Sequence, residues 1–397
     1  MKNIFLSLIV TSIFVSTFSV SVNSAYAVTT TKTKTTTKKV TATVFSKEIT
    51  DVLKKSFTVG VWIPYWQRDK GVAQGTDKIK QIDIVSPFAY EMTPTGTFKD
   101  TLKLDQDPYK SLVDVAHANK KLVVPSILWW AVGEQGRSDV DFVLKDSDLR
   151  WAIRYDILKA IKDYNLDGID IDFENKKSET KEAFSTFLIE LSKDLHAKKK
   201  ILVCTIESRT PTDEELAGSK SIKTVERAND FKVIGKVCDQ VRVMAYDQDT
   251  ADTSLNAIRT GAYRPVADID WVKKVIILAL RDIPAKKLIL GVPTYGYKYE
   301  ITRDVKGDIA TYTRLGSMNW FYADELARQK NITPTRHVSG ELFYTYIDAL
   351  SSKEYLVWYS DAQSIKQKVD LAKLYKLGGI AIFKIDGNND TTLWDKL

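Results

Sequence analysis

Three carboxylic acids occupy alternate positions of one short apolar run, at Asp170, Asp172 and Glu174. Side chains alternate across a β-strand, so a strand over residues 168–174 places the three carboxyls on one face, about 6–7 Å apart. The positions between them are apolar: Ile169, Ile171 and Phe173. Burial and like charge both disfavour ionisation, so at least one of these carboxyls should have a raised pKa. A carboxyl with a raised pKa is what a general acid requires.

A divalent-metal site is the alternative interpretation of the same carboxyls. Metal ligands usually come from several strands, and the chain's three histidines are scattered at His117, His196 and His337. A metal-dependent deacetylase or phosphoesterase would need His and Asp ligands at several strand ends, and the strand runs do not supply them. We therefore expect catalytic carboxyls, with no metal and no cofactor.

The elements that must position these residues alternate between short β-rich runs and longer stretches of helical period. Eight runs have strand character: 57–63, 82–88, 122–128, 168–173, 201–206, 241–246, 288–292 and 379–383. This alternation is typical of βα units around a parallel sheet, and eight of them predict an α/β fold, a (β/α)8 TIM barrel. About seventy residues separate the seventh run from the last helix. A structureless loop of that length is improbable, so we expect a small α+β insertion at about 297–357.

The first 39 residues carry most of the chain's net charge. Residues 1–27 have the pattern of a secretory signal peptide, ending in Ala25-Tyr26-Ala27. Residues 28–55 begin with a Thr/Lys-rich stretch that we expect to be a linker, and 56–397 should form the catalytic barrel. Five of the 58 basic residues lie in the first 39 positions, so 53 basic residues face 51 acidic ones in the remainder. The net charge of +7 therefore does not indicate a nucleic-acid-binding protein.

Composition excludes several other classes of protein. Nine tryptophans and eighteen tyrosines with 27% charged residues exclude a disordered chain. The two cysteines, Cys204 and Cys238, exclude a disulfide-rich scaffold. The two cysteines could form a disulfide, but the strand assignments place them at different heights along the barrel. We expect two buried thiols that behave as small hydrophobic residues.

Residues 167–174 (DGIDIDFE) resemble the DGxDxDxE signature of the family 18 glycoside hydrolases, the chitinase-like group. Two further segments are similar to family elements: 244–247 (MAYD) to MxYD, and 291–296 (GVPTYG) to G-I/V-P-x-Y-G. Segments 358–361 (WYSD), with Ser364, Lys368 and 378–379, and 86–88 (SPF), with Tyr90, resemble the branch of bacterial spore-germination and cortex-lytic N-acetylglucosaminidases.

The resemblance implies substrate-assisted retention, in which Glu174 protonates the glycosidic oxygen and the sugar's own acetamido oxygen attacks C1. Asp172 would orient the acetamido group, and Asp170 would share a proton with Asp172. Tyr246 would donate to the acetamido oxygen, and Asp247 would bind the distorted sugar. This chemistry requires a 2-acetamido sugar at the cleaved bond.

Substrate contacts are expected from residues at the predicted barrel mouth, where aromatic rings can stack on sugars. The expected substrate-binding residues are Asp247, Met244, Tyr295, Phe383, Trp62, Trp129 and Tyr90. Tyr65, Trp66, Trp130 and Tyr297 accompany them at the same strand ends. Phe383 stands where the family usually has a tryptophan, and it offers a smaller platform without an indole N–H.

The sequence thus predicts an exported glycosidase, secreted or cell-wall associated, that cleaves β-1,4 bonds of N-acetylglucosamine-containing polymers such as peptidoglycan or chitin. The alternative is a catalytically weak or silent carbohydrate-binding barrel. Silent members typically lose the glutamate or an aspartate of the column, and all three are present here. We expect a monomer that binds polysaccharide, does not bind nucleic acid and is not inserted in a membrane once the signal is removed.

Overall fold

A computed structural model describes residues 45–211, 227–387, 390 and 392–397, and the expected signal peptide lies outside them. Eight parallel strands pair in a closed ring, in the order β1-β15-β9-β8-β7-β6-β5-β2 and back to β1. Their bounds are β1 Thr58–Ile63, β2 Ile84–Met92, β5 Ser126–Trp130, β6 Gly168–Glu174, β7 Ile201–Glu207, β8 Gln240–Met244, β9 Leu288–Pro293 and β15 Gly379–Phe383. The short strands β3 Phe98–Asp100 and β4 Leu122–Val123 pair with β2. The predicted (β/α)8 barrel is confirmed.

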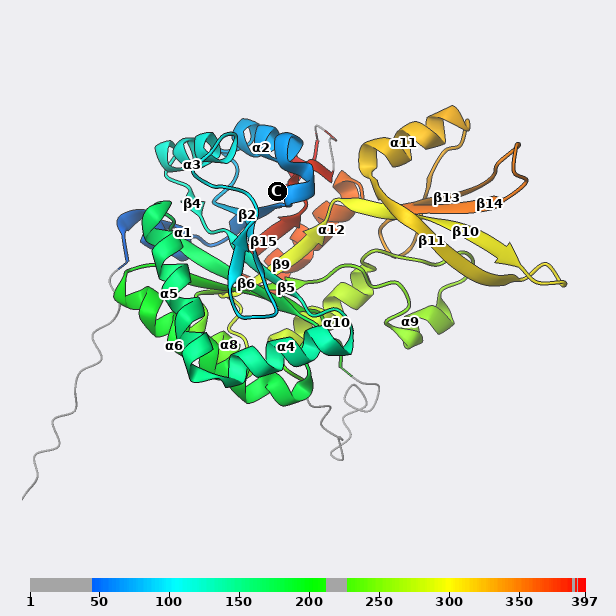
Figure 1. Ribbon diagram of the computed structural model, residues 1–397. Helices are drawn as coiled ribbons and strands as arrows, with labels where there is room; N and C mark the ends of the chain where they lie inside the picture. The colour runs from blue at the N-terminus through cyan, green and yellow to red at the C-terminus, as the bar shows by residue number, and fades with distance from the viewer. Residues whose placement is uncertain (1–44, 212–226, 388–389, 391) are drawn as a thin grey trace, which may run out of the picture. The chain divides into compact units, whose positions relative to one another are not determined.

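Helices surround this ring (Figure 1). They are α2 Arg68–Asp77, α3 Tyr109–Ala118, α4 Gly133–Lys145, α5 Ser147–Asp163, α6 Lys181–Ala197, α8 Phe231–Val237, α9 Thr253–Ile258, α10 Ile269–Ala279 and α12 Ala362–Leu374. Aspartates at the N-caps of α5, α8, α10 and α12 accept backbone N–H groups, which fixes where these helices begin. The apolar core lies between the helices and the outward faces of the strands. The inward faces are left to carry the polar residues described below.

The expected α+β insertion is present and runs from β10 to β14. Its five-stranded antiparallel sheet has the order β11-β10-β14-β13-β12. The bounds are β10 Tyr295–Arg303, β11 Ile309–Asn319, β12 Thr335–Arg336, β13 Leu342–Ile347 and β14 Glu354–Tyr359, with α11 Trp320–Gln329. Helix α11 packs on one face of this sheet through Ala323 and Ala327 (Figure 1). Because β10 begins directly after β9, the insertion is attached at the carboxyl end of a barrel strand, the face at which such barrels place their sites.

The expected linker boundary at residue 55 is wrong. Residues 47–54 form a helix, α1 Lys47–Lys54, capped by the Ser46 side chain. Its apolar residues Ile49 and Val52 are 1% and 4% exposed and pack against the barrel strands. Amphipathic spacing within this short segment gives it enough apolar surface to fold onto the barrel, so the folded region begins before residue 55.

The expectation of two free thiols is also wrong, because Cys204 and Cys238 form a disulfide. Cys204 lies on the outward face of β7, and Cys238 follows α8 at the turn into β8. The turn brings the second cysteine under the first, with a Cα–Cα distance of 6.1 Å, although the two are not level in the strand register. Among the described residues, no helix has the length and apolar character needed to cross a membrane.

Candidate active site

Strand β6 carries the carboxyl column into the barrel interior, as its alternation predicts. The register with β5 sets Ser126 beside Asp170 and Trp130 beside Glu174. Asp170 and Asp172 are 0% and 3% exposed, and Glu174 is half-buried at the carboxyl end of the strand. The outward residues Ile169, Ile171 and Phe173 belong to the core. The column therefore runs from the sealed interior to the mouth.

Asp170, at the bottom of the column, is held by four side-chain donors. They are Trp62 Nε1 at 3.1 Å, Ser126 Oγ at 2.9 Å, Thr205 Oγ1 at 2.8 Å and Arg242 Nη1 at 3.1 Å. Arg242 is itself fully buried, so the two form an ion pair inside the barrel. Among the described residues no hydrogen bond joins Asp170 to Asp172. The Arg242–Asp170 ion pair anchors the base of the column, and the sharing of a proton between Asp170 and Asp172 stays a prediction.

Asp172 and Glu174 have raised pKa values for different reasons. Burial, followed by the charges of Glu174 and Asp170, raises the pKa of Asp172 well above its ordinary value. Its Oδ1 atom is buried without a hydrogen-bond donor among the described residues. Burial and the nearby Glu207 raise the pKa of Glu174 to about 7, against the lowering effect of the Trp130 hydrogen bond. Near neutral pH Glu174 is therefore poised between its protonated and ionised forms, and the raised pKa of Asp172 makes that carboxyl easier to protonate than an ordinary aspartate.

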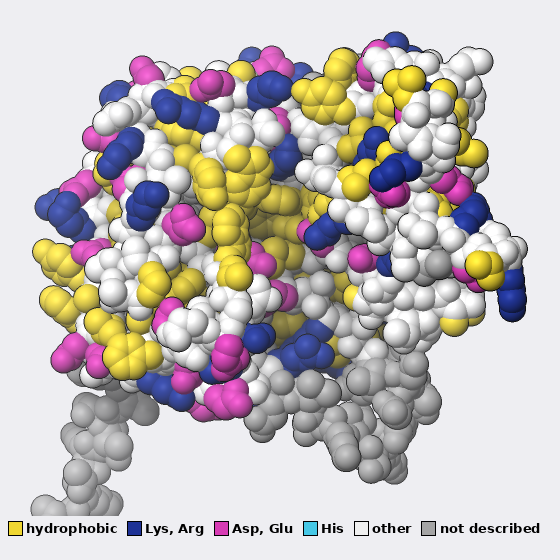
Figure 2. All heavy atoms as spheres, turned by 45° about the vertical axis from the view of Figure 1, so that its right-hand side comes forward, with side chains coloured by type: hydrophobic (Ala, Val, Ile, Leu, Met, Phe, Trp, Pro, Cys, Tyr) yellow, Lys and Arg dark blue, Asp and Glu magenta, His cyan; other side chains and the backbone are white. Residues whose placement is uncertain are grey.

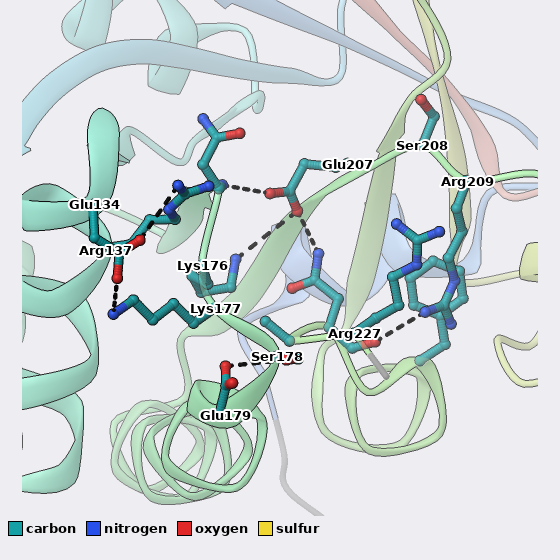
Figure 3. Close-up of a pocket in the computed structure, with 14 residues that line it drawn as sticks. Glu134, Arg137, Lys176, Lys177, Ser178, Glu179, Glu207, Ser208, Arg209 and Arg227 are labelled. Carbon is teal, nitrogen blue, oxygen red and sulfur yellow. Dashed lines mark hydrogen bonds and ion pairs between the residues drawn. The ribbon is translucent and has the colours of Figure 1, made fainter. Parts of the chain in front are cut away.

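Two ionisable residues that the sequence analysis did not single out control this electrostatic balance. Lys176 is fully buried, donates to the Phe173 carbonyl and lies 3.9 Å from the Glu207 carboxylate. Glu207, at the end of β7, accepts from the Asn175 backbone N–H at 2.7 Å and from Asn229 (Figure 3). Burial opposes ionisation of Glu207, but Lys176 and these donors lower its pKa overall. An ionised Glu207 therefore acts as the like charge that keeps a proton on Glu174.

An aromatic layer lies beside the carboxyls, with Phe383 at its centre. The Phe383 ring stacks on Tyr246 at 5.2 Å between centroids and on Phe88 at 5.9 Å. Trp62 and Tyr295 meet the Phe383 ring edge-on. No hydrogen bond to the Tyr246 hydroxyl is found among the described residues, so this group is available to a ligand. The structure thus brings four of the expected residues together: Tyr246, Tyr295, Trp62 and Phe383.

Met244 ends strand β8, and Asp247 follows it three residues later. Asp247 accepts from the hydroxyls of Tyr295 and Tyr297, each at 2.7 Å. The Met244 side chain is on the same face of β8 as Arg242, which points into the barrel, and it is half-buried. Asp247 is exposed, and its backbone has a φ of 56°. Both residues therefore stand at the mouth.

Trp129 is not at the site, contrary to expectation. Its ring packs edge-on against Phe173 at 5.3 Å in the core outside the barrel, and it is 5% exposed. The neighbouring Trp130 points inward and donates its Nε1–H to Glu174 Oε1 at 2.8 Å. Because side chains alternate on β5, only one of the two tryptophans can reach the carboxyls, and it is Trp130.

Tyr90 also lies outside the site. A register shift in β2 between Phe88 and Tyr90 turns Tyr90 outward, where its ring packs on Phe98 at 4.9 Å. Burial raises the pKa of Tyr90, and its hydroxyl has no partner among the described residues. Phe88, just before the shift, faces the interior instead. A β-bulge adds one residue to a strand and so reverses the facing of everything after it.

Exposed rings continue the aromatic surface away from the carboxyls. Trp66 is 45% exposed, and its ring lies 6.2 Å from Trp130 and 4.9 Å from Tyr65. Figure 2 shows apolar side chains along a hollow in this face of the molecule. Flat apolar rings of this kind fit the apolar faces of sugars. Among the described residues, no group of three or more His, Cys, Asp or Glu side chains could hold a metal ion.

Comparisons with known proteins agree with this geometry. The model of the family described as "Glycosyl hydrolases family 18" matches residues 61–388. The glycosylase YvbX of Bacillus subtilis is 26% identical over 60% of this chain and 62% of its own length. The cortical fragment-lytic enzyme of Bacillus subtilis is 26% identical over 61% of this chain and 52% of its own length. The matched region thus spans half to three fifths of these relatives.

Solved structures share the fold. The spore cortex-lytic enzyme SleL of Bacillus megaterium has a TM-score of 0.68 at 23% identity, covering 85% of this chain and 72% of that one. A chitinase of Chromobacterium violaceum has a TM-score of 0.67 at 21% identity, covering 85% of this chain and 97% of that one. The barrel and its insertion are therefore an arrangement that these structures share.

Proposed function

The chain belongs to the family 18 glycosyl hydrolases, and from this premise we propose that it is an exported retaining glycosidase. Its substrate would be a polymer containing N-acetylglucosamine, and its reaction the hydrolysis of β-1,4 bonds. Peptidoglycan and chitin are both such polymers. The similarity to a cortical fragment-lytic enzyme and, over 60% of this chain, to chitinase A1 of Niallia circulans supports this substrate class.

Glu174 is the general acid in this proposal. Its carboxyl gives a proton to the glycosidic oxygen as the C1–O bond breaks, and the bond's electron pair leaves with that oxygen. The acetamido oxygen of the same sugar bonds to C1 and forms an oxazolinium ring. Glu174, now a carboxylate, takes a proton from water, whose oxygen attacks C1 and opens the ring with net retention.

The observation that carries the proposal is the pKa of about 7 at Glu174, at the mouth of a column whose lower members are buried. Such a group can hold a proton for the first step and lose it in the next at the same pH. Asp172 stands next in the column and would orient the acetamido group and take up its developing positive charge. The unpartnered Tyr246 hydroxyl would donate to the acetamido oxygen.

Export is supported by the disulfide between Cys204 and Cys238. Disulfides persist in oxidising compartments and are rare in the cytosol. The proposal therefore places the mature enzyme outside the cell, secreted or associated with the wall, where glycan polymers are found.

The test compares Glu174→Gln with Glu182→Gln, an exposed position on α6. Release of a chromophore from GlcNAc-oligomer glycosides should fall by about 1,000-fold or more in the first variant, because glutamine has no proton to give. It should be unchanged in the second. Circular dichroism should show both variants folded. Equal turnover in Glu174→Gln and the wild type would exclude the mechanism.

A further inference from the structure

A cavity of about 650 Å³ opens at the ends of β5, β6 and β7, and its lining includes Glu207, whose charge acts on Glu174 (Figure 3). Its walls are the segments that follow β5, β6 and β7 in the described chain, with lining residues in 134–137, 175–179 and 207–209 and between 227 and 231. All three strands end at the barrel mouth, so the cavity is on the catalytic face. Asn175 and Lys176, which line the cavity, follow Glu174 directly in the sequence, so the cavity lies close to the end of the carboxyl column.

Among the lining residues that the structure describes, positive charge predominates. Five are cationic, Arg137, Lys176, Lys177, Arg209 and Arg227, and three are acidic, Glu134, Glu179 and Glu207. The cations come from both sides, with Arg137 and Lys177 on one side and Arg209 and Arg227 on the other (Figure 3).

Each of the three carboxylates already has donors within the cavity. Glu134 accepts from Lys177 at 2.5 Å, Glu179 from Ser178 at 3.0 Å, and Glu207 from the Asn175 N–H at 2.7 Å. The described acids of the lining are therefore satisfied within it, and even without Arg209 the described lining residues include more cations than acids. An uncharged sugar gives no reason for such an excess, whereas an anionic group does.

Arg137 is the best placed cation for a ligand. It lies in the first half of α4, and its side chain is 44% exposed. Among the described residues its one ion pair is with Glu134, at 3.4 Å, and Lys177 approaches the same carboxylate more closely. A guanidinium carries five N–H donors in a planar fork that matches a carboxylate. The Arg137 Nε is buried without a partner among the described residues and Nη2 faces Glu134, so Nη1 is the part of the fork that can meet a bound anion.

The neighbouring cations are held in position. Lys177 also donates to Ser138 Oγ at 2.9 Å, and Arg209 lies over the Phe231 ring at 3.5 Å. Fixed side chains lose little entropy when a ligand binds, so the site is prepared for an anion rather than assembled around it.

We propose that this cavity binds a carboxylate-bearing substituent of the glycan next to the cleaved bond. The preferred substrate is then an acidic N-acetylated polymer, such as a cell-wall glycan with lactyl ethers or attached peptides, rather than uncharged chitin. This inference rests on the proposed glycosidase function and adds its substrate preference. The carboxylate can belong to the lactyl group or to a peptide, since both present the same chemistry.

The experiment measures kcat/KM of the full chain on four tetrasaccharides. One is the neutral GlcNAc tetramer, one alternates GlcNAc with sugars bearing free lactyl carboxylates, one has those carboxylates converted to amides, and one carries short peptides. We expect the wild type to prefer a carboxylate-bearing substrate to the amide form. The ratio of acidic to neutral kcat/KM should fall about tenfold in Arg137→Ala, the effect of one charge-assisted hydrogen bond. Arg137→Lys should restore part of the ratio, because it keeps the charge without the fork.

Lys145→Ala is the matched control, since Lys145 is an exposed cation on the same helix, bonded to Asp141 outside the cavity. It should leave the ratio unchanged. An unchanged ratio in Arg137→Ala, or equal turnover of the acidic and amide substrates, would overturn the inference. Preference for the lactyl or for the peptide form identifies the source of the carboxylate.

Binding separates this inference from the proposed function. Calorimetric titration of the acidic and neutral tetrasaccharides into Glu174→Gln, with and without Arg137→Ala, needs no turnover. If the acidic glycan binds more tightly than the neutral one, and Arg137→Ala removes the difference, the cavity binds the carboxylate even if the wild type hydrolyses neither substrate. Equal affinities for the two glycans contradict it even if the wild type is an active glycosidase.

Discussion

Glu341 in the insertion and Asp172 in the barrel are both buried carboxylic acids with opposite surroundings. Glu341 is 0% exposed and accepts from the backbone N–H groups of Val266 and Ala267, from Trp358 Nε1 and from Ser360 Oγ. The buried ammonium of Lys368 lies 3.7 Å away. Asp172 is 3% exposed, has acidic neighbours along its strand and has a buried oxygen without a donor among the described residues.

The contrast shows that burial alone does not make a carboxyl reactive. Glu341 joins the insertion to the barrel by satisfying donors from both, so its charge is compensated within the protein. Asp172 and Glu174 are left with like charges around them and few donors, so their pKa values are raised and the two carboxyls can respond to a substrate. The two sites therefore predict opposite consequences for the same kind of substitution.

Asp172→Asn should have the largest effect on turnover. The amide fills the same volume but cannot take up positive charge from the acetamido group, so kcat should fall by about 100-fold or more. The folded-state pKa of Asp172 lies above its unfolded value, so this acid weakens the native state as pH rises past the unfolded pKa. The free energy of unfolding at pH 7 should therefore increase in the variant. Steady-state kinetics and urea unfolding measure the two effects, and a loss of stability would contradict the description of this site.

Glu341→Gln should have the reverse pattern. The substitution leaves the buried ammonium of Lys368 without its charge partner, which costs about 3 kcal/mol of unfolding free energy. Turnover by the folded fraction should stay near that of the wild type, since Glu341 does not contact the carboxyl column. Urea denaturation followed by tryptophan fluorescence measures the loss, with Glu182→Gln as the exposed control. A variant as stable as the wild type would show that the polar network is dispensable.

Tyr246→Phe should lower kcat by about tenfold, the value of one well-placed donor near developing charge. The ring stays stacked on Phe383, so the thermal midpoint should change little. Tyr155→Phe, on the exposed side of α5, is the control for loss of a hydroxyl. Full activity in Tyr246→Phe would remove the acetamido contact from the mechanism.

Glu207→Gln should have the smallest effect, a shift of the pH profile. Glu174 must be protonated for the first step, so kcat/KM of the wild type should fall as pH rises through about 7. Removing the like charge of Glu207 lowers the pKa of Glu174, so the fall of kcat/KM on the alkaline side should move to lower pH. Profiles between about pH 5 and 9 measure it, with Glu134→Gln on the exposed cavity rim as control. If the alkaline fall of kcat/KM stays at the same pH in Glu207→Gln, Glu207 does not influence the pKa of Glu174.

Sequence alone predicted correctly which side chains of β6 face the barrel interior, because that signal is local. Alternation has a period of two, so the facing of Asp172 and Glu174 relative to Phe173 follows from the chain itself. The barrel follows from eight strand runs and the insertion from one connection that was too long for a loop. Phe383 and Tyr246 end their expected strand runs and Tyr295 stands soon after its run, so the sequence predicts all three at the mouth.

Arg242 illustrates a weaker signal. An arginine within an apolar strand run, two positions before Met244, indicates a polar group that faces the interior. The sequence does not show which carboxylate it meets. That partner, Asp170, comes from a strand 72 positions earlier, so only the closed ring brings the pair together.

What the sequence by itself determined is therefore the fold, the carboxyl column and the mouth at which it ends. Only the tertiary structure decided which neighbours each carboxyl has. The bulge in β2 turned Tyr90 outward, the register of β5 gave Trp130 rather than Trp129 to Glu174, and the turn after α8 joined Cys238 to Cys204. Facing along one strand is a local property of the backbone. Pairing between strands depends on register and on added residues, which are set when the whole barrel closes.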